Sequence, residues 1–337
     1  NTNLLVDETT LSGNDTENFS TAFTVNYGAD NAGTTAYSLS VLSEGVNSGV
    51  VDIATGQAIW LYSEFGGVVG RVGSGGVANS SGAIAFNITV DSSTGAVTLD
   101  QVRALQHPDA SNPNELINLT NDTVILTATA TDKDGDQNSA SLNIGNRIGF
   151  RDDAPTVAVV ATTTNLLVDE TSLASNATQD FSTSFNVNYR ADGAGTTVYS
   201  LGISGAGVPS GVVDVATGQG VYLFLESGSV VGRVGSGGVA DAGGAEAFRI
   251  SVNAGTGEVT LDQVLALTHP TGGTGSPNEL INLTTNAVTL TATVTDKDGD
   301  SATASISLGD KVGFRDDAPT VAVVATTTNL LVDETSL

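Results

Sequence analysis

The chain has 337 residues, 39% of them hydrophobic, and its 37 acidic and 11 basic side chains give a formal net charge of −26. This charge excludes a nucleic-acid partner, because binding a polyanion requires Lys and Arg to displace counterions, and it favours a cation partner instead. The chain has no Cys, which excludes a disulfide framework, and no apolar run approaches the roughly 18 residues that span a bilayer.

The motif Asn-Leu-Leu-Val-Asp-Glu-Thr divides the chain into tandem repeats. It begins at Asn3, Asn165 and Asn329, so the spacing is 162 and then 164 residues. The two extra residues fall in a Gly-rich insert after the second His-Pro dipeptide, which predicts a surface loop. We expect three segments: residues 1–153, a repeat that lacks its first strand segment; residues 154–316, a second repeat; and residues 317–337, the start of a third. The absence of Met suggests a piece of a longer, processed chain.

Short β-strands are the predicted elements throughout. In chain order they are Phe19–Tyr27, Ala36–Val41, Ala58–Tyr62, Val68–Val72, Ala85–Val90, Val97–Leu99, Val124–Thr131 and Ser139–Ile144. The last two alternate apolar and polar residues with period two and flank an acidic turn, which predicts a hairpin. Helical turns are expected only at Asp100–Leu105 and its counterpart Asp262–Leu267. Regularly spaced short strands predict an all-β fold of tandem immunoglobulin-like antiparallel β-sandwiches in a linear array.

Acidic residues recur in three clusters per repeat. They are the hairpin tips (Asp132, Asp134, Asp136 and Asp296, Asp298, Asp300), the Asp-Asp-Ala-Pro linkers (Asp152, Asp153 and Asp316, Asp317), and the Asp-Glu pairs of the repeated motif (Asp7, Glu8 and Asp169, Glu170). Ca²⁺ takes about six to eight oxygen ligands, which closely spaced Asp residues in a Gly-containing turn can supply. The tip is not an EF-hand, because the twelfth residue from Asp132 is Asn143 and not an acid.

The topology of an immunoglobulin-like sandwich predicts that the clusters meet. The last hairpin of such a domain points to the end where the chain enters, so the tip at Asp296–Asp300 should lie near Asp152 and Asp153. The first long strand runs from the entrance to the exit, which should place Asp7 and Glu8 near the same linker. Carboxylates gathered in this way repel one another without a cation. We therefore predict a calcium site that stiffens the joint between repeats; a solvated acidic surface with polar turns is the alternative interpretation.

Both repeats carry four blocks that are similar to a known family. They are Leu126–Asp136, Arg151–Pro155, Val97–Pro108 and Gly56–Gly73, with their counterparts in the second copy. In these blocks the chain resembles the tandem repeats of giant repeats-in-toxin (RTX) adhesins exported by type I secretion, and its acidic linker and loops are similar to those of cadherin. The resemblance implies cadherin-like extracellular extenders, rigid with calcium, that hold an adhesive tip away from a bacterial cell surface in attachment or biofilm formation. It implies neighbouring repeats as partners and leaves a surface or glycan receptor unidentified.

Other functions are weighed against this one. An enzyme is not expected, because His107 and His269 lie in matching His-Pro turns and no second His or Cys exists to build a triad or a zinc site. A self-assembling extracellular filament is one alternative: a spare segment at Asp317–Thr328 would complete the first sandwich of another molecule by strand addition. A carbohydrate- or ice-binding module is another, which flat rows of exposed Thr or an aromatic cleft would indicate.

Overall fold

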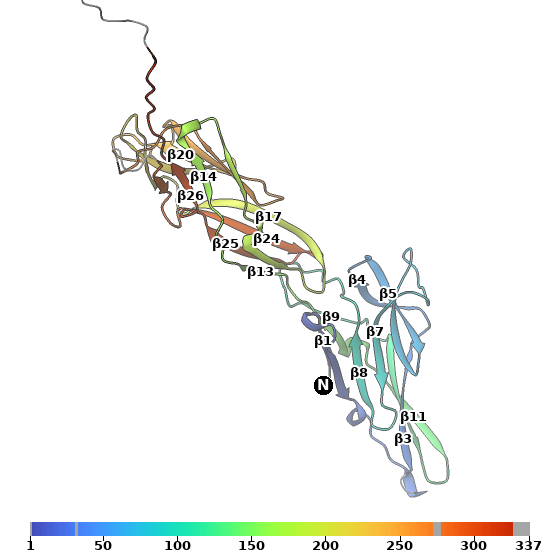
Figure 1. The fold of residues 1–337 in the computed structure, drawn as a ribbon. Coiled ribbons are helices and arrows are strands. Elements are labelled where there is room, and N and C mark those ends of the chain that lie inside the picture. The colour runs from blue at the N-terminus through green and yellow to red at the C-terminus, as the bar shows by residue number, and fades with distance from the viewer. Residues whose placement is uncertain (1, 31–32, 272–277, 326–337) are drawn as a thin grey trace, which may run out of the picture.

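A computed structural model describes residues 2–30, 33–271 and 278–325, and it shows two β-rich units that follow one another along an elongated molecule (Figure 1). The first unit, repeat 1, contains β1 (Leu4–Asp7), β2 (Asn14–Asn18), β3 (Thr34–Val41), β4 (Val46–Asp52), β5 (Gln57–Glu64), β6 (Gly67–Val72), β7 (Ile84–Val90), β8 (Ala96–Gln101), β9 (Leu116–Asn118), β10 (Val124–Thr131), β11 (Gln137–Asn143) and β12 (Ile148–Arg151). The second unit, repeat 2, contains β13 (Thr156–Val159), β14 (Leu166–Asp169), β15 (Ala177–Asp180), β16 (Phe185–Asn188), β17 (Ala194–Ile203), β18 (Val208–Val213), β19 (Gly220–Glu226), β20 (Ser229–Val234), β21 (Glu246–Val252), β22 (Glu258–Gln263), β23 (Leu280–Asn282), β24 (Val288–Asp296), β25 (Ser301–Ser307) and β26 (Val312–Arg315).

The helical segments of the described residues are single 3-10 turns. They are η1 (Glu8–Thr10), η2 (Ser20–Ala22), η3 (Gly28–Asp30), η4 (Gly145–Arg147), η5 (Glu170–Ser172) and η6 (Ser182–Ser184). Over the same described ranges, no helix is long and apolar enough to cross a membrane. The inserted loop at 272–277 and the third copy of the repeated motif lie outside the described residues.

Three sheets recur in each repeat. In repeat 1 they have the orders β2-β8-β7-β6-β5-β4, β1-β12-β9 and β3-β10-β11, and repeat 2 has the counterparts β15-β22-β21-β20-β19-β18, β14-β26-β23 and β17-β24-β25. The pairings are antiparallel except that β1 runs parallel to β12, as β14 does to β26. This parallel pairing places Asp7 opposite Arg151. The Asp-Glu pair of the repeated motif therefore lies at the end where the chain leaves repeat 1.

Each repeat encloses its own hydrophobic core. In repeat 1 the ring of Phe86 lies fully buried against Phe150, with ring centroids 5.1 Å apart, and in repeat 2 Phe248 and Phe314 repeat this contact at 5.2 Å. Gly70 faces the Phe86 ring so closely that a Cβ atom there would meet the ring at 2.5 Å. Close packing of this kind makes each repeat a stable platform for the loops at its two ends.

The predicted antiparallel all-β fold is confirmed, and so are most of the predicted strands. The predicted helical turns at Asp100–Leu105 and Asp262–Leu267 are wrong. In repeat 1, Asp100 and Gln101 instead complete β8, opposite Asn87 and Phe86 of β7. Their polar side chains suggested a helix, but the pairing with β7 and contacts of the Gln101 side chain hold them in the sheet.

The predicted strand at Phe19–Tyr27 is also wrong for repeat 1. Residues 20–22 form η2 and residues 23–27 have no regular structure, whereas the equivalent segment of repeat 2 contains β16. The difference has a visible cause, because β16 pairs with β13, and no strand among the described residues pairs with residues 23–27. A strand forms here only when a partner supplies its hydrogen bonds.

Candidate metal centre

The linker between the repeats contributes two buried carboxylates. Asp152 and Asp153 directly follow β12 and are each 3% exposed. The backbone N–H of Asp152 donates to the Glu115 carbonyl at 2.9 Å, and buried Pro155 follows just before β13 begins. The chain is therefore held on both sides of the acidic pair.

The β24–β25 hairpin brings three more carboxylates to the linker. Its tip is closed by the Asp296 N–H, which donates to the Asp300 carbonyl at 3.0 Å, and by the Gly299 N–H, which donates to Asp296 Oδ1 at 3.1 Å. Gly299 has φ +115°, a conformation that glycine adopts without a Cβ clash. Asp296 and Asp300 are 4% and 1% exposed, and Asp298 lies between them.

A sixth carboxylate, Asp192, comes from the loop that precedes β17. Asp192 is 3% exposed. Its loop can lie directly on the hairpin because Gly195, in a β-bulge of β17, touches the Asp296 carbonyl where any Cβ would clash. The linker and two segments of repeat 2 thus bring six carboxylates together at the end of repeat 1.

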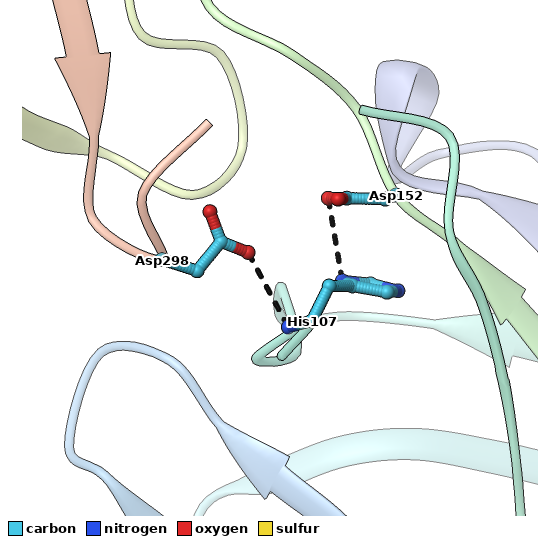
Figure 2. A group of neighbouring side chains, drawn as sticks. All are labelled: His107, Asp152 and Asp298. Carbon is cyan, nitrogen blue, oxygen red and sulfur yellow. Dashed lines mark hydrogen bonds and ion pairs between the residues drawn. The ribbon is translucent and has the colours of Figure 1, made fainter. Parts of the chain in front are cut away.

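Three overlapping groups of ligand atoms result. They are His107 with Asp152 and Asp298, Asp152 with Asp153 and Asp192, and Asp192 with Asp296 and Asp298. Within each group the ligand atoms lie within 4.8 Å of one another. Oxygens on opposite sides of a Ca²⁺ ion lie about 5 Å apart, because each Ca–O distance is about 2.3–2.6 Å. The spacing of these carboxylates therefore fits a calcium ion. Figure 2 shows Asp298 and Asp152 approaching His107 from different elements.

Buried oxygens without hydrogen-bond partners are concentrated at this junction. They include both carboxylate oxygens of Asp153 and of Asp192, and one oxygen each of Asp152, Asp296, Asp298 and Asp300. A buried polar group without a partner costs about 1–3 kcal/mol, and folded proteins leave few of them. A bound cation would supply the missing partner to the whole set.

The raised pKa values of these side chains show that ionising the buried carboxylates is unfavourable without a cation. Burial, with neighbouring carboxylates adding to it, raises the pKa of Asp152 to about 9, of Asp192 to about 10 and of Asp296 to about 7. The pKa values of Asp153 and Asp300 are raised as well, chiefly by burial. A divalent cation would favour the ionised forms, because an opposite charge stabilises a carboxylate.

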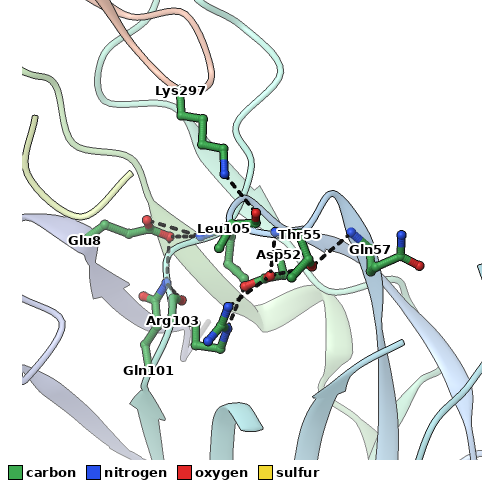
Figure 3. A network of polar contacts seen from close by, with 9 residues as sticks. Glu8, Asp52, Thr55, Gln57, Gln101, Arg103, Leu105 and Lys297 are labelled. Carbon is green, nitrogen blue, oxygen red and sulfur yellow. Dashed lines mark hydrogen bonds and ion pairs between the residues drawn. The ribbon is translucent and has the colours of Figure 1, made fainter. Parts of the chain in front are cut away.

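Two hydrogen bonds position the hairpin tip. The backbone N–H of His107 donates to Asp298 Oδ2 at 3.3 Å, while its ring Nδ1 lies 3.3 Å from Asp152 Oδ1 without hydrogen-bond geometry (Figure 2). Lys297 of repeat 2 turns toward repeat 1, where its Nζ donates to the Ala54 carbonyl at 2.8 Å (Figure 3). The tip is thus fastened to repeat 1 at two points beside the carboxylates.

Asp7 and Glu8 lie at this end of repeat 1 in different roles. Asp7 is exposed, and its Oδ1 accepts from the Thr9 N–H at 2.9 Å as the cap of η1. Glu8 is 1% exposed, and its Oε1 accepts from Gln101 Nε2 at 2.6 Å and from the Leu105 N–H at 3.0 Å (Figure 3). Burial raises the pKa of Glu8 to about 8. Glu8 therefore holds the loop that carries His107 in place through hydrogen bonds, and Asp7 lies at the edge of the junction.

The remaining predicted residues lie at the two ends of the molecule. At the hairpin tip of repeat 1, Asp134 and Asp136 are exposed and Asp132 is half-buried. Past β26, the Asp317 side chain is exposed, and Asp316 Oδ1 lies 3.5 Å from His269 Nδ1. Asp169 caps η5, and Glu170 accepts from Gln263 and Leu267 as Glu8 does from its own partners. These residues form two half-sites, each equivalent to one side of the junction.

Asp192 and His107 are the junction residues that the sequence analysis missed as participants. Asp192 is a single acid in a loop, although Asp30 occupies the same position of the repeat, and this recurrence was the available signal. His107 was interpreted as a turn residue, and its proximity to Asp152 depends on tertiary structure.

Comparison with known proteins places the repeats in a family. Residues 3–145 and 165–309 match the family described as "Domain of unknown function (DUF5801)". No curated protein matches the sequence significantly. Among solved structures, protocadherin gamma B7 extracellular cadherin domains 1–4 align over 81% of this chain and 76% of that chain, with 9% identity and a TM-score of 0.12, which is too low to support an argument. Because the two matched segments cover most of both repeats, the chain belongs to the DUF5801 family and contains two copies of its domain.

Proposed function

We propose that this chain is a calcium-stiffened extender of a secreted bacterial cell-surface adhesin. The observation that carries the proposal is the junction, where six aspartates from the linker and repeat 2 lie together beside His107 of repeat 1, most of them buried with unpaired oxygens. The ions would hold repeat 1, the linker and repeat 2 in one arrangement.

The chemistry of the junction favours calcium over other metals. Apart from His107 in one group, its ligands are carboxylate oxygens, which suit hard cations, whereas a structural zinc site is built mainly from Cys and His. The three ligand groups overlap without coinciding, because Asp152, Asp192 and Asp298 each belong to two of them. Carboxylates shared in this way would bridge neighbouring ions, and six negative charges would need more than one divalent cation for balance. The junction therefore favours at least two calcium ions.

The stiffening follows from where the ligands come from. With ions bound, bending the molecule at the linker would pull Asp298 and Asp192 of repeat 2 away from Asp152 of the linker. Without them, the same carboxylates would repel one another across the joint or take up protons. Rigidity would thus depend on the calcium concentration around the protein, which is high outside cells.

The resemblance to repeats-in-toxin adhesins supports the wider role. Such extenders would make contact mainly with neighbouring repeats, and recognition of a surface or glycan receptor would belong to another part of the adhesin.

Calorimetric titration with calcium and small-angle X-ray scattering test the proposal. We expect binding at the junction, and a shorter, broader distribution of particle lengths after a chelator is added. Asp153→Asn combined with Asp192→Asn should abolish the tightest binding, whereas Asp317→Asn, a matched change at an exposed acid, should preserve it. The proposal is wrong if the chain binds no calcium and its length is the same with chelator.

A further inference from the structure

The tight turn between β5 and β6 presents an aromatic ring to solvent. Phe65 and Gly66 form this turn, with φ angles of +54° and +78°. Turns of this kind favour Asn or Gly at the first of the two positions, because a bulky side chain is strained there. Phe65 is 87% exposed, so its ring buries little apolar surface in return. Neither the turn nor the core therefore accounts for a Phe at this position.

The Phe65 ring borders an open hollow of about 370 Å³ on the outer face of the six-stranded sheet of repeat 1. Asp100 of β8 lies in this hollow and pairs with Asn14 of β2 on one side and with Asn87 of β7 on the other, so the three side chains share one face. Ligand pockets of proteins commonly measure about 300–1,000 Å³, so the hollow is large enough for a small ligand.

The polar groups of the hollow retain capacity for hydrogen bonds. The Asn87 Nδ2 donates to Asp100 Oδ2 at 3.5 Å, which is at the limit of a hydrogen bond. An amide carries two N–H donors and a carbonyl acceptor, and a carboxylate accepts several hydrogen bonds. A sugar matches such a surface, because each hydroxyl both donates and accepts and because its C–H face packs on an aromatic ring.

The charges around the hollow favour a neutral sugar over a charged one. Two carboxylates line the hollow, those of Glu64 and Asp100. Glu64 is paired with the Arg71 guanidinium, at 2.8 Å from Nε and 2.6 Å from Nη2. Asp100 and the net charge of −26 would repel an anionic sugar. One exposed carboxylate offers a cationic partner little, because exposed charge pairs are weak.

In repeat 2 the ring and the amide are both replaced. Ser227 takes the place of Phe65 and keeps the same turn, with φ +49°. Arg249 takes the place of Asn87, and its guanidinium is paired with Glu246 at 2.6 Å. The fold of the repeat is therefore compatible with either pair of residues, and the ring and amide of repeat 1 are not needed to build the sheet.

We propose that this hollow of repeat 1 binds a neutral oligosaccharide. The Phe65 ring would pack on the C–H face of one sugar unit, and the side chains of Asn87 and Asp100 would form hydrogen bonds with its neighbouring hydroxyls. The stalk itself would then contact surrounding polysaccharide, in addition to receptor recognition by another part of the adhesin. This binding goes beyond the role of a stiffened extender and does not rest on the calcium junction.

NMR titration of the isotope-labelled full chain tests the proposal, with hexasaccharides of glucose, galactose, mannose and N-acetylglucosamine as neutral probes. We expect at least one of them to bind at repeat 1, and an alginate hexasaccharide not to bind. Phe65→Ser combined with Asn87→Arg installs the residues of repeat 2 and should weaken binding at least about tenfold, because the ring and the amide are both lost. Leu42→Ser, a change at a 60% exposed apolar residue outside the hollow, should bind like the unmodified chain.

A variant that keeps the ring separates stacking from a general effect of substitution. Phe65→Tyr preserves the ring face and should bind within about threefold of the unmodified chain. Binding of none of the neutral probes, equal binding by the double variant, or binding of a hexalysine peptide alone would overturn the proposal. The substituted residues lie outside the carboxylate cluster of the junction, so calcium titration of the same samples tests the proposed function separately.

Discussion

Repeats 1 and 2 have similar sequences but different surroundings, and the difference separates what a repeat builds alone from what two repeats build together. The Asp-Lys-Asp-Gly-Asp tip occurs in both repeats. Asp136 at the tip of repeat 1 is exposed, whereas Asp300, its counterpart in repeat 2, is only 1% exposed. The cores, by contrast, are built from equivalent positions, as the buried rings of Phe86 and Phe248 illustrate. A single repeat therefore fixes its core, and its acidic clusters become a buried site only where another repeat meets them.

A second difference concerns the segment next to the hairpin sheet. Phe185 in β16 is 6% exposed beneath β13, while its counterpart Phe23 is only partly buried. Both rings keep their aromatic neighbour, at centroid distances of 5.9 Å to Tyr199 and 6.0 Å to Tyr37. The added strand thus changes burial and regularity without rearranging the contacts beneath it.

The largest expected effect comes from removing these two rings. Phe185→Ala should lower the free energy of unfolding of repeat 2 by about 3–5 kcal/mol, the usual cost of a buried Phe, and Phe23→Ala should cost repeat 1 about 2 kcal/mol because its ring is already partly solvated. Calorimetric unfolding of the four single variants checks this. Phe86→Ala and Phe248→Ala are controls that should cost the two repeats equal amounts, and equal costs for Phe23 and Phe185 would contradict the comparison.

Next in size is the contrast between the two hairpin tips. Asp298→Asn should weaken calcium binding at the junction at least about tenfold, because Asp298 belongs to two of the ligand groups. Asp134→Asn changes the equivalent residue of the exposed tip and should leave that binding unchanged. Calorimetric titration measures both, and equal effects would show that the tip binds calcium without the linker.

Much of this junction is predictable from the sequence because topology is regular. The direction of the strands in a sandwich is enough to predict that the tip at Asp296–Asp300 lies near the linker at Asp152–Asp153. The role of Glu8 could not, because its partners Gln101 and Leu105 are 93 and 97 residues away and their approach depends on how two sheets pack. Asp192 was missed because one acid in a loop carries no local pattern.

The predicted strand at Phe19–Tyr27 failed for a related reason. Its alternating side chains suit a strand equally well in both repeats, but regular structure needs a partner, and that partner comes from a separate segment. Local pattern therefore predicts which residues can pair, and the surrounding chain decides whether they do.

The next prediction concerns pH and has a smaller expected effect. As pH rises, the stability of the calcium-free protein should fall, whereas its affinity for calcium should rise. The raised pKa values of Asp296, Asp152 and Asp192, about 7, 9 and 10, mean that the calcium-free folded protein binds more protons than the unfolded chain. Its stability should thus fall as pH rises from about 5 to 8. Calcium competes with these protons, so its affinity should rise over the same range. Melting curves and titrations at several pH values check the two signs, and a calcium affinity independent of pH would contradict them.

The smallest expected effect concerns a polar contact that the repeats do not share. In repeat 1 the Arg103 guanidinium donates to buried Asp52 at 2.7 Å (Figure 3), whereas repeat 2 has Leu265 in place of Arg103. Burial acts to raise the pKa of Asp52, but hydrogen bonds from Arg103 and Thr55 outweigh it and lower this pKa overall.

Arg103→Leu makes repeat 1 resemble repeat 2 at this position, and two effects compete in the outcome. Breaking a fully buried ion pair can cost about 3–5 kcal/mol, but the Arg103 side chain is 31% exposed, and pairs open to water are worth about 1 kcal/mol or less. Repeat 2 decides between them: its Asp214 is 2% exposed and is held there by the Thr217 hydroxyl and N–H. We therefore expect a loss of about 1 kcal/mol in chemical unfolding of repeat 1. A loss of about 3 kcal/mol would mean that Thr55 does not support Asp52 as Thr217 supports Asp214.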